Sequence, residues 1–145
     1  MLHRMTGAAV SGRKVLVAED DDELRGLVVE ALRDDGYAVV EARDGAELLE
    51  ALARSLAGAP EDHFDAIVAE QSLPGLEGLT ILAGLRARGL GTPFVLITAD
   101  PEIQARARRL DAVVLDQPFN TQAIRDAVTE ASAVSTRTSR IPSTS

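Results

Sequence analysis

The chain has 145 residues, a formal net charge of −8 and a sequence pI near 4.7. This length suits one compact domain with its own core. The acidic balance argues against nucleic acid or a membrane surface as the main partner. There is no cysteine, so we expect no disulfide bonds and a cytoplasmic protein. No segment is apolar enough over its length to predict a membrane span or a signal peptide.

Short apolar runs alternate with helical patterns along the chain. Buried strands are predicted at residues 14–18, 37–41, 66–69, 93–97 and 112–115. Each run is followed by apolar residues spaced three and four positions apart, such as Leu24, Leu27 and Val28, a stripe typical of a helix that packs on a core. This alternation predicts a single α/β domain, in which helices cover both faces of a doubly wound parallel sheet.

The folded domain is predicted at residues 13–131. Residues 1–12 lack apolar periodicity and predict a flexible N-terminal tail, whereas residues 132–145 are rich in serine and threonine and predict a disordered C-terminal tail. Residues 57–62, with Gly58 and Pro60, form a longer connection than so tight a unit needs. We therefore expect a surface insertion there.

Polar side chains follow four of the predicted strands, at the point where each strand leaves the core. Glu19 and Asp20 follow the first strand, Glu70 the third, Thr98 the fourth and Gln117 the fifth. The carboxyl ends of parallel strands share one edge of a doubly wound sheet, and ligands bind at that edge. The sequence therefore predicts one candidate site, which these residues form together.

These motifs, taken in order, resemble the receiver domain of two-component response regulators. The resemblance rests on the acid pair at 19–20, the acid at 70 with Leu-Pro-Gly-x-x-Gly at 73–78, Thr-Ala at 98–99 and Gln-Pro-Phe at 117–119. It covers residues 14–131. It implies a flavodoxin-like (βα)5 fold with strand order 2-1-3-4-5, and a cis peptide bond between Gln117 and Pro118.

The resemblance also implies roles for the site residues. In the family the acid pair holds Mg²⁺, an aspartate after the third strand accepts a phosphoryl group, and a threonine and a lysine contact the phosphoryl oxygens. Mg²⁺ prefers hard oxygen ligands, and transfer requires that the charge on the phosphoryl oxygens be neutralised. By position, Glu19 and Asp20 match the acid pair and Thr98 matches the threonine.

Three positions depart from the family pattern. Glu70 stands at the phosphoacceptor position, Gln117 at the lysine position, and Val114 where the family usually has an aromatic that swings inward on activation. The single lysine of the chain, Lys14, lies at the far end of the first strand. The departures predict a degenerate, or pseudo-, receiver without catalytic residues.

Two interpretations of Glu70 remain open from the sequence. Glutamate is one methylene longer than aspartate, so its carboxylate reaches toward the place of a phosphoryl group. Thr98 and Gln117 can donate to it, and this hydrogen-bond set would imitate part of the phosphorylated geometry. Alternatively, Glu70 is a solvated acid at a site that has lost its chemistry, and Gln117 is a polar filler.

The acids at this site form a like-charge cluster. A divalent ion such as Mg²⁺ can relieve it, held by Glu19, Asp20, Glu70 and Ser72; alternatively one carboxylate has a raised pKa, or water and loop relaxation separate the charges. The sequence predicts no required cofactor, and only weak Mg²⁺ binding.

We expect a stand-alone module that binds a signalling protein without a phosphorylation cycle. The predicted docking face is formed by the fourth helix, the fifth strand and the fifth helix, with arginines at 106, 108 and 109 on that fourth helix. One alternative is a receiver that still accepts a phosphoryl group on Glu70 and switches. A second is a flavodoxin-like cofactor binder, which the acidic sheet edge and the lack of a glycine-rich phosphate loop disfavour. The partner, the pathway and the oligomeric state do not follow from the sequence.

Overall fold

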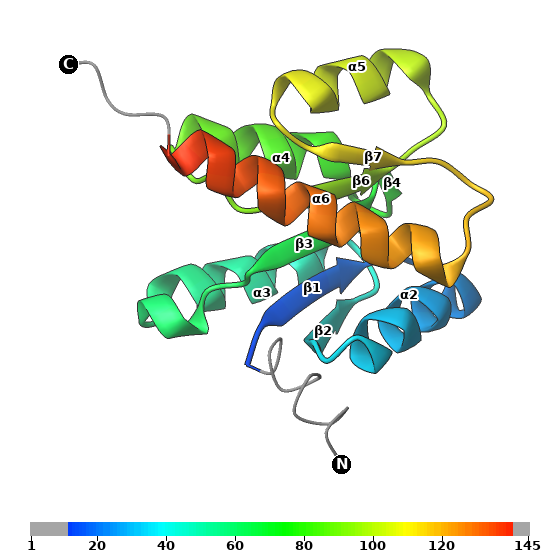
Figure 1. Cartoon of the computed structure of the whole chain (residues 1–145), viewed down its shortest axis with the longest axis horizontal. Coiled ribbons are helices and arrows are strands. Elements are labelled where there is room, and N and C mark those ends of the chain that lie inside the picture. Colours follow the sequence, from blue (N-terminus) through cyan, green and yellow to red (C-terminus); the bar gives the residue numbers. More distant parts are fainter. Residues whose placement is uncertain (1–11, 141–145) are drawn as a thin grey trace.

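The computed structural model describes residues 12–140 and consists of one sheet between two layers of helices (Figure 1). The expected N-terminal tail lies, except for Gly12, outside the described residues. In the described part of the chain, no helix combines the length and the apolar character needed to cross a membrane.

The central sheet has five parallel strands in the order β2-β1-β3-β6-β7. Its strands are β1 (Lys14–Ala18), β2 (Ala38–Ala42), β3 (Ala66–Glu70), β6 (Phe94–Ile97) and β7 (Val113–Leu115). Counted along the chain within this sheet, the order is 2-1-3-4-5, so the predicted fold and strand order are confirmed. A separate two-stranded hairpin, β4 (Ser72–Leu73) and β5 (Leu76–Glu77), surrounds the Pro74-Gly75 turn.

The helices follow the strands as the sequence predicted. They are α2 (Asp22–Asp34), α3 (Gly45–Ala57), α4 (Gly78–Ala87), α5 (Pro101–Arg109) and α6 (Thr121–Arg140), with a short 3-10 helix, η1 (Pro60–Asp62), in the connection after α3. Side chains of Asp21, Asp44 and Asp100 accept hydrogen bonds from backbone N–H groups in the first turns of α2, α3 and α5. Such caps stabilise helix starts, whose N–H groups lack partners within the helix.

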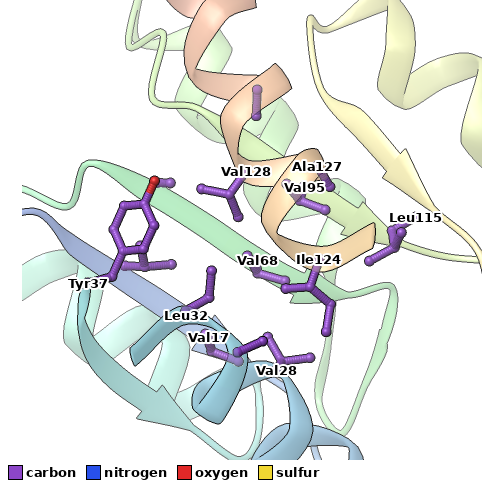
Figure 2. Packing of buried hydrophobic residues seen from close by; sticks show 14 of the residues in the cluster. Val17, Val28, Leu32, Tyr37, Val68, Val95, Leu115, Ile124, Ala127 and Val128 are labelled. Atoms are coloured by element: carbon purple, nitrogen blue, oxygen red, sulfur yellow. The ribbon is translucent and has the colours of Figure 1, made fainter. Parts of the chain in front are cut away.

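Apolar side chains cover both faces of the sheet because successive strand residues point to opposite sides. Val17, Val68 and Val95 pack with α2 and α6 on one face, and Figure 2 shows Ile124 of α6 among them. Leu16, Ile67 and Leu96 lie on the opposite face with α3, α4 and α5. This two-sided burial explains why β1, β3 and β6 are nearly continuous apolar runs rather than alternating ones. The expectation of a buried strand at residues 37–41 is wrong, because β2 lies at the edge of the sheet and is largely exposed.

Two boundary predictions can be compared with the structure. Residues 57–62 are exposed, as expected for a surface insertion, and the Ser55 hydroxyl donates to the Asp62 carbonyl at 2.8 Å to hold the connection against α3. The prediction of a disordered tail from Ser132 is wrong as far as Arg140, because α6 continues to that residue. Serine and threonine lower helix propensity only modestly, and neither glycine nor proline occurs between Thr121 and Pro142. Residues 141–145 lie outside the described part.

Candidate functional site

The strand register brings the predicted site residues to one edge of the sheet. Glu70, the last residue of β3, lies beside Ile97 of β6, which in turn lies beside Leu115 of β7. Thr98 and Gln117 follow these two strands directly. The edge encloses a pocket of about 360 Å³. Its lining residues are Glu70, Ser72, Ile97, Thr98, Ala99, Asp100, Asp116 and Gln117.

The half-buried Glu70 carboxylate contacts the loops on both sides of it. Its Oε1 accepts from the Gln117 Nε2 amide at 3.4 Å, and its Oε2 accepts from the Ser72 backbone N–H, also at 3.4 Å. Burial raises the pKa of Glu70, while the backbone N–H groups of Ser72 and Gln71 lower it. Glu70 therefore points into the site, and its contact with Gln117 forms as the sequence-based hypothesis requires.

Thr98 lines the same pocket but holds a different loop. Its hydroxyl oxygen accepts from the Asp100 backbone N–H at 3.2 Å, and its carbonyl accepts from the Gln104 side chain at 2.9 Å. Such a turn, between a threonine hydroxyl and the N–H two residues on, is a common local contact. Within residues 12–140, Thr98 forms no hydrogen bond with Glu70. Of the predicted hydrogen bonds among Glu70, Thr98 and Gln117, the described part of the chain therefore contains the one between Gln117 and Glu70.

Glu19 is the most deeply buried acid of the site, with 2% of its surface exposed. Its Oε2 accepts from the Asp21 backbone N–H at 3.0 Å, while its Oε1 has no hydrogen-bond partner within residues 12–140. The pKa of Glu19 is raised to about 7, mainly by burial and also by the neighbouring Asp20 and Glu70 carboxylates, against the opposing effect of the Asp21 N–H. The raised pKa of Glu19 agrees with one of the three ways to relieve the like-charge cluster, a proton on one carboxylate.

The donor set at this site is chemically suited to a hard cation. Carboxylate oxygens are the ligands that Mg²⁺ prefers, and Glu19 Oε1 is unpartnered. Nevertheless, no group of three or more Asp, Glu, His or Cys side chains in residues 12–140 is placed to hold one metal ion. Mg²⁺ is usually held by only one or two carboxylates together with water, so weak Mg²⁺ binding by Glu19, Asp20, Glu70 and Ser72 stays a prediction, and we derive no step through a metal.

The loop after β3 is fixed by a residue that the sequence reading missed. The Gln71 side chain, 6% exposed, donates to Glu77 and accepts from the Leu79 backbone N–H, each at 2.8 Å. Gly78 packs so closely that an added Cβ would lie 2.8 Å from the Glu70 carbonyl oxygen. A glutamine after a strand has no distinctive sequence signal. Its position directly after Glu70 at the sheet edge could nevertheless have suggested a role in fixing the loop.

Residues after the last two strands complete the site and the adjoining face. The Gln117–Pro118 peptide bond is cis, which confirms the expectation from the resemblance. Val114 of β7 is half-buried and packs against the cluster on the α3 side of the sheet. Arg106, Arg108 and Arg109 are exposed on the last turn and a half of α5, beside β7.

Comparison with known proteins identifies the family of the chain. The family model described as response regulator receiver domain matches residues 15–129. The chain is 32% identical over 114 residues to the transcriptional regulatory protein TcrA of Mycobacterium tuberculosis, a match that covers 77% of this chain and 42% of that protein. It is 34% identical over 109 residues to the response regulator MprA of Mycobacterium leprae, covering 73% and 45%. The chain thus spans less than half the length of these relatives.

Solved structures agree on the architecture. The chemotaxis response regulator CheY4 of Vibrio cholerae superposes with a TM-score of 0.67 at 26% identity, covering 82% of this chain and 98% of that one. A response regulator receiver domain protein from Clostridium thermocellum gives a TM-score of 0.75 at 20% identity, covering 87% and 98%. The second likeness concerns the fold alone.

Proposed function

The chain belongs to the response regulator receiver domain family of two-component signalling, and we propose that within it this protein is a pseudo-receiver that docks onto a signalling protein without a phosphorylation cycle. The observation that carries the proposal is the contact between Glu70 and Gln117. These two residues occupy the positions at which the motif pattern leads one to expect an acceptor aspartate and a lysine.

The missing lysine removes the fixed cation that phosphoryl transfer needs. Charge on the phosphoryl oxygens must be neutralised in the transition state, and a neutral amide does this far less well than an ammonium group. Lys14, the one lysine of the chain, cannot substitute, because its Nζ donates to the Asp62 carbonyl at the opposite edge of the sheet. The site is therefore poorly equipped to form an acyl phosphate.

The same two residues are suited to a permanent structural role. The Gln117 amide joins the loop after β7 to the end of β3, so the start of α6 is linked to the acceptor position without a phosphoryl group. At 3.4 Å between a half-buried carboxylate and an exposed amide, this contact is weak by itself, worth about 1 kcal/mol or less. Its proposed role is to bias the position of the loop rather than to hold the fold together.

A second candidate function is residual phosphoryl acceptance. The pocket of about 360 Å³ has room for a phosphoryl group, and Glu70 lines it. In that case a Glu70 oxygen would attack the phosphorus of an acyl phosphate and the carboxylate of the donor would leave. In the described part of the chain no lysine or arginine lines this pocket, which makes phosphoryl acceptance the less favoured alternative.

The proposed partner surface is the face formed by α5, β7 and α6. It adjoins the Gln117 loop, and it presents the exposed Arg106, Arg108 and Arg109 in a chain of net charge −8. Positive charge on this face favours a partner with an acidic surface.

Amide chemical shifts of the ¹⁵N-labelled protein test the proposal. We expect Gln117→Ala to change the amide shifts of Val114 and Phe119, whereas Gln122→Ala, an exposed glutamine on α6, leaves them unchanged. Adding a small-molecule phosphodonor with Mg²⁺ should change no shift on the α5–β7–α6 face. The proposal is contradicted by phosphodonor-dependent shifts on that face in the wild-type protein that Glu70→Gln abolishes.

A further inference from the structure

An open apolar groove lies between α3 and α4, on the side of the sheet opposite α2 and α6. It has a volume of about 310 Å³. Its walls include Leu49, Ala53 and Leu56 from α3, Thr80 and Gly84 from α4, and Arg88, which caps the C-terminus of α4. We propose that this groove receives an amphipathic helix of a protein partner, and that an acidic side chain of this helix pairs with Arg88.

Small residues keep the groove open where the two helices face each other. Ala53 and Thr80 are short, and a Cβ added to Gly84 would meet no atom within 4 Å. Beneath them, Leu52 and Ile81 are almost fully buried and belong to the core cluster on this side of the sheet. The groove therefore has a firm apolar floor that needs no rearrangement before a ligand binds.

The most exposed large hydrophobic side chain of residues 12–140 lies on the wall of this groove. Leu49 is 50% exposed, the largest fraction among the large hydrophobic side chains of residues 12–140. Leu49, Ala53 and Leu56 follow one stripe of α3 at spacings of four and three, so the groove extends over two helical turns. Contiguous apolar surface of this kind marks an interaction site, whereas single exposed apolar residues do not. Two turns of groove match the apolar positions of a docked helix.

Arg88 places a positive charge at one end of the groove. It is the one charged residue that lines the groove, and its side chain forms no hydrogen bond or ion pair within residues 12–140. On the outer side of α3, by contrast, Arg54 and Glu50 neutralise each other at 2.6 Å. An unpaired arginine at one end of an apolar groove selects a ligand with a carboxylate at the matching position, and so fixes the direction of the bound helix.

The shape and charge of the groove favour a different protein over a second copy of this chain. In a two-fold pairing the same patch meets itself, so Arg88 would need an acid in the same groove, and no acid lines it. Two concave surfaces also leave space between them, whereas a convex helix fills one. The proposal is independent of the proposed function, because the groove shares no lining residue with the pocket at Glu70.

Selection from a phage-displayed library of helical peptides tests the proposal. The full chain is the target, and Gly84→Glu, which places a charged side chain in the open groove, is the blocking variant. Gly26→Glu is the matched control, because Gly26 also has no atom within 4 Å of an added Cβ but lies on α2, on the other side of the sheet. Both substitutions replace a helical glycine with a better helix former, and thermal unfolding verifies that both variants fold.

We expect selected peptides to carry an apolar i, i+4, i+7 stripe and an Asp or Glu near one end. Their Kd measured by fluorescence anisotropy should rise by about tenfold or more with Gly84→Glu and stay unchanged with Gly26→Glu. Arg88→Glu should reverse the preference between such a peptide and its acid-to-lysine version.

Two outcomes overturn the proposal. The first is that no selected peptide prefers the wild-type groove to the Gly84→Glu variant. The second is a concentration-dependent dimer of the free protein, seen by analytical ultracentrifugation, that Gly84→Glu dissociates, since the occupant would then be a second copy.

Discussion

Replacing Glu19 with glutamine should stabilise the protein at about pH 8 and have little effect at about pH 5. Glu19 is buried, and its pKa is raised from 4.5 to about 7. Glutamine has nearly the same shape, carries no charge at either pH, and its carbonyl oxygen can still accept from the Asp21 N–H. The substitution therefore removes the cost of a buried charge while keeping the hydrogen bond.

The sign and size follow from the raised pKa of Glu19. A folded-state pKa above the unfolded one means that the stabilising effect of the bound proton is complete below about pH 4.5 and is lost as the pH rises through about 7. At about 1.4 kcal/mol per pKa unit, the difference between 4.5 and about 7 corresponds to about 3 kcal/mol. At about pH 5 the same linkage leaves less than about 1 kcal/mol between the two proteins.

Urea unfolding at the two pH values measures this difference. Wild-type protein, Glu19→Gln and the control Glu23→Gln are compared in buffers with EDTA, so that stray divalent ions do not stabilise the wild-type acids. Glu23 is exposed in the first turn of α2, so its replacement should change the unfolding free energy by less than about 0.5 kcal/mol. A Glu19→Gln protein that is less stable than wild type at about pH 8 refutes the reasoning.

Further predictions concern the scaffold of the site, each measured by urea unfolding. Gly78→Ala should lower the free energy of unfolding by about 1–3 kcal/mol, because the added Cβ would lie 2.7 Å from Leu96 Cδ1. Gly84→Ala places its Cβ in open space and should raise the free energy of unfolding by up to about 1 kcal/mol. Equal effects of the two substitutions would contradict the packing argument. Asp44→Ala should cost about 1 kcal/mol through loss of the α3 cap, and an unchanged midpoint would show the cap to be dispensable. Ile124→Ala, 1% exposed in the cluster of Figure 2, should cost about 2–5 kcal/mol, and a loss below 1 kcal/mol would argue against close packing.

The pattern of apolar residues along the chain is sufficient to predict the sheet and the residues that gather at the carboxyl ends of its strands. Strands such as 14–18 and 93–97 are apolar on both faces, which only a two-sided parallel sheet satisfies. Once the sheet is known, topology alone brings the residues after each strand together, so Glu70 and Gln117 could be predicted as neighbours. The cis bond before Pro118 followed from the resemblance.

Side-chain partners could not be predicted in the same way. Thr98 can donate to an acid or close a turn with its own loop, and only the backbone after β6 decides that it accepts from Asp100. The orphan oxygen of Glu19 depends on how closely three loops pack around it. Similarly, the end of α6 was predicted too early because composition suggests disorder at residues 132–140, whereas helix continuation depends on the absence of a breaker.

The proposed function requires that this receiver does not carry a phosphoryl group on Glu70. Intact mass after incubation with acetyl phosphate and Mg²⁺ tests it most directly, with a conventional receiver as positive control. The double variant Glu70→Asp, Gln117→Lys serves as the matched comparison, because it restores the acceptor and the cation together. We expect no labile adduct on the wild-type chain and a gain of modification in the double variant. A labile adduct on the wild-type chain that maps to Glu70 would contradict the claim.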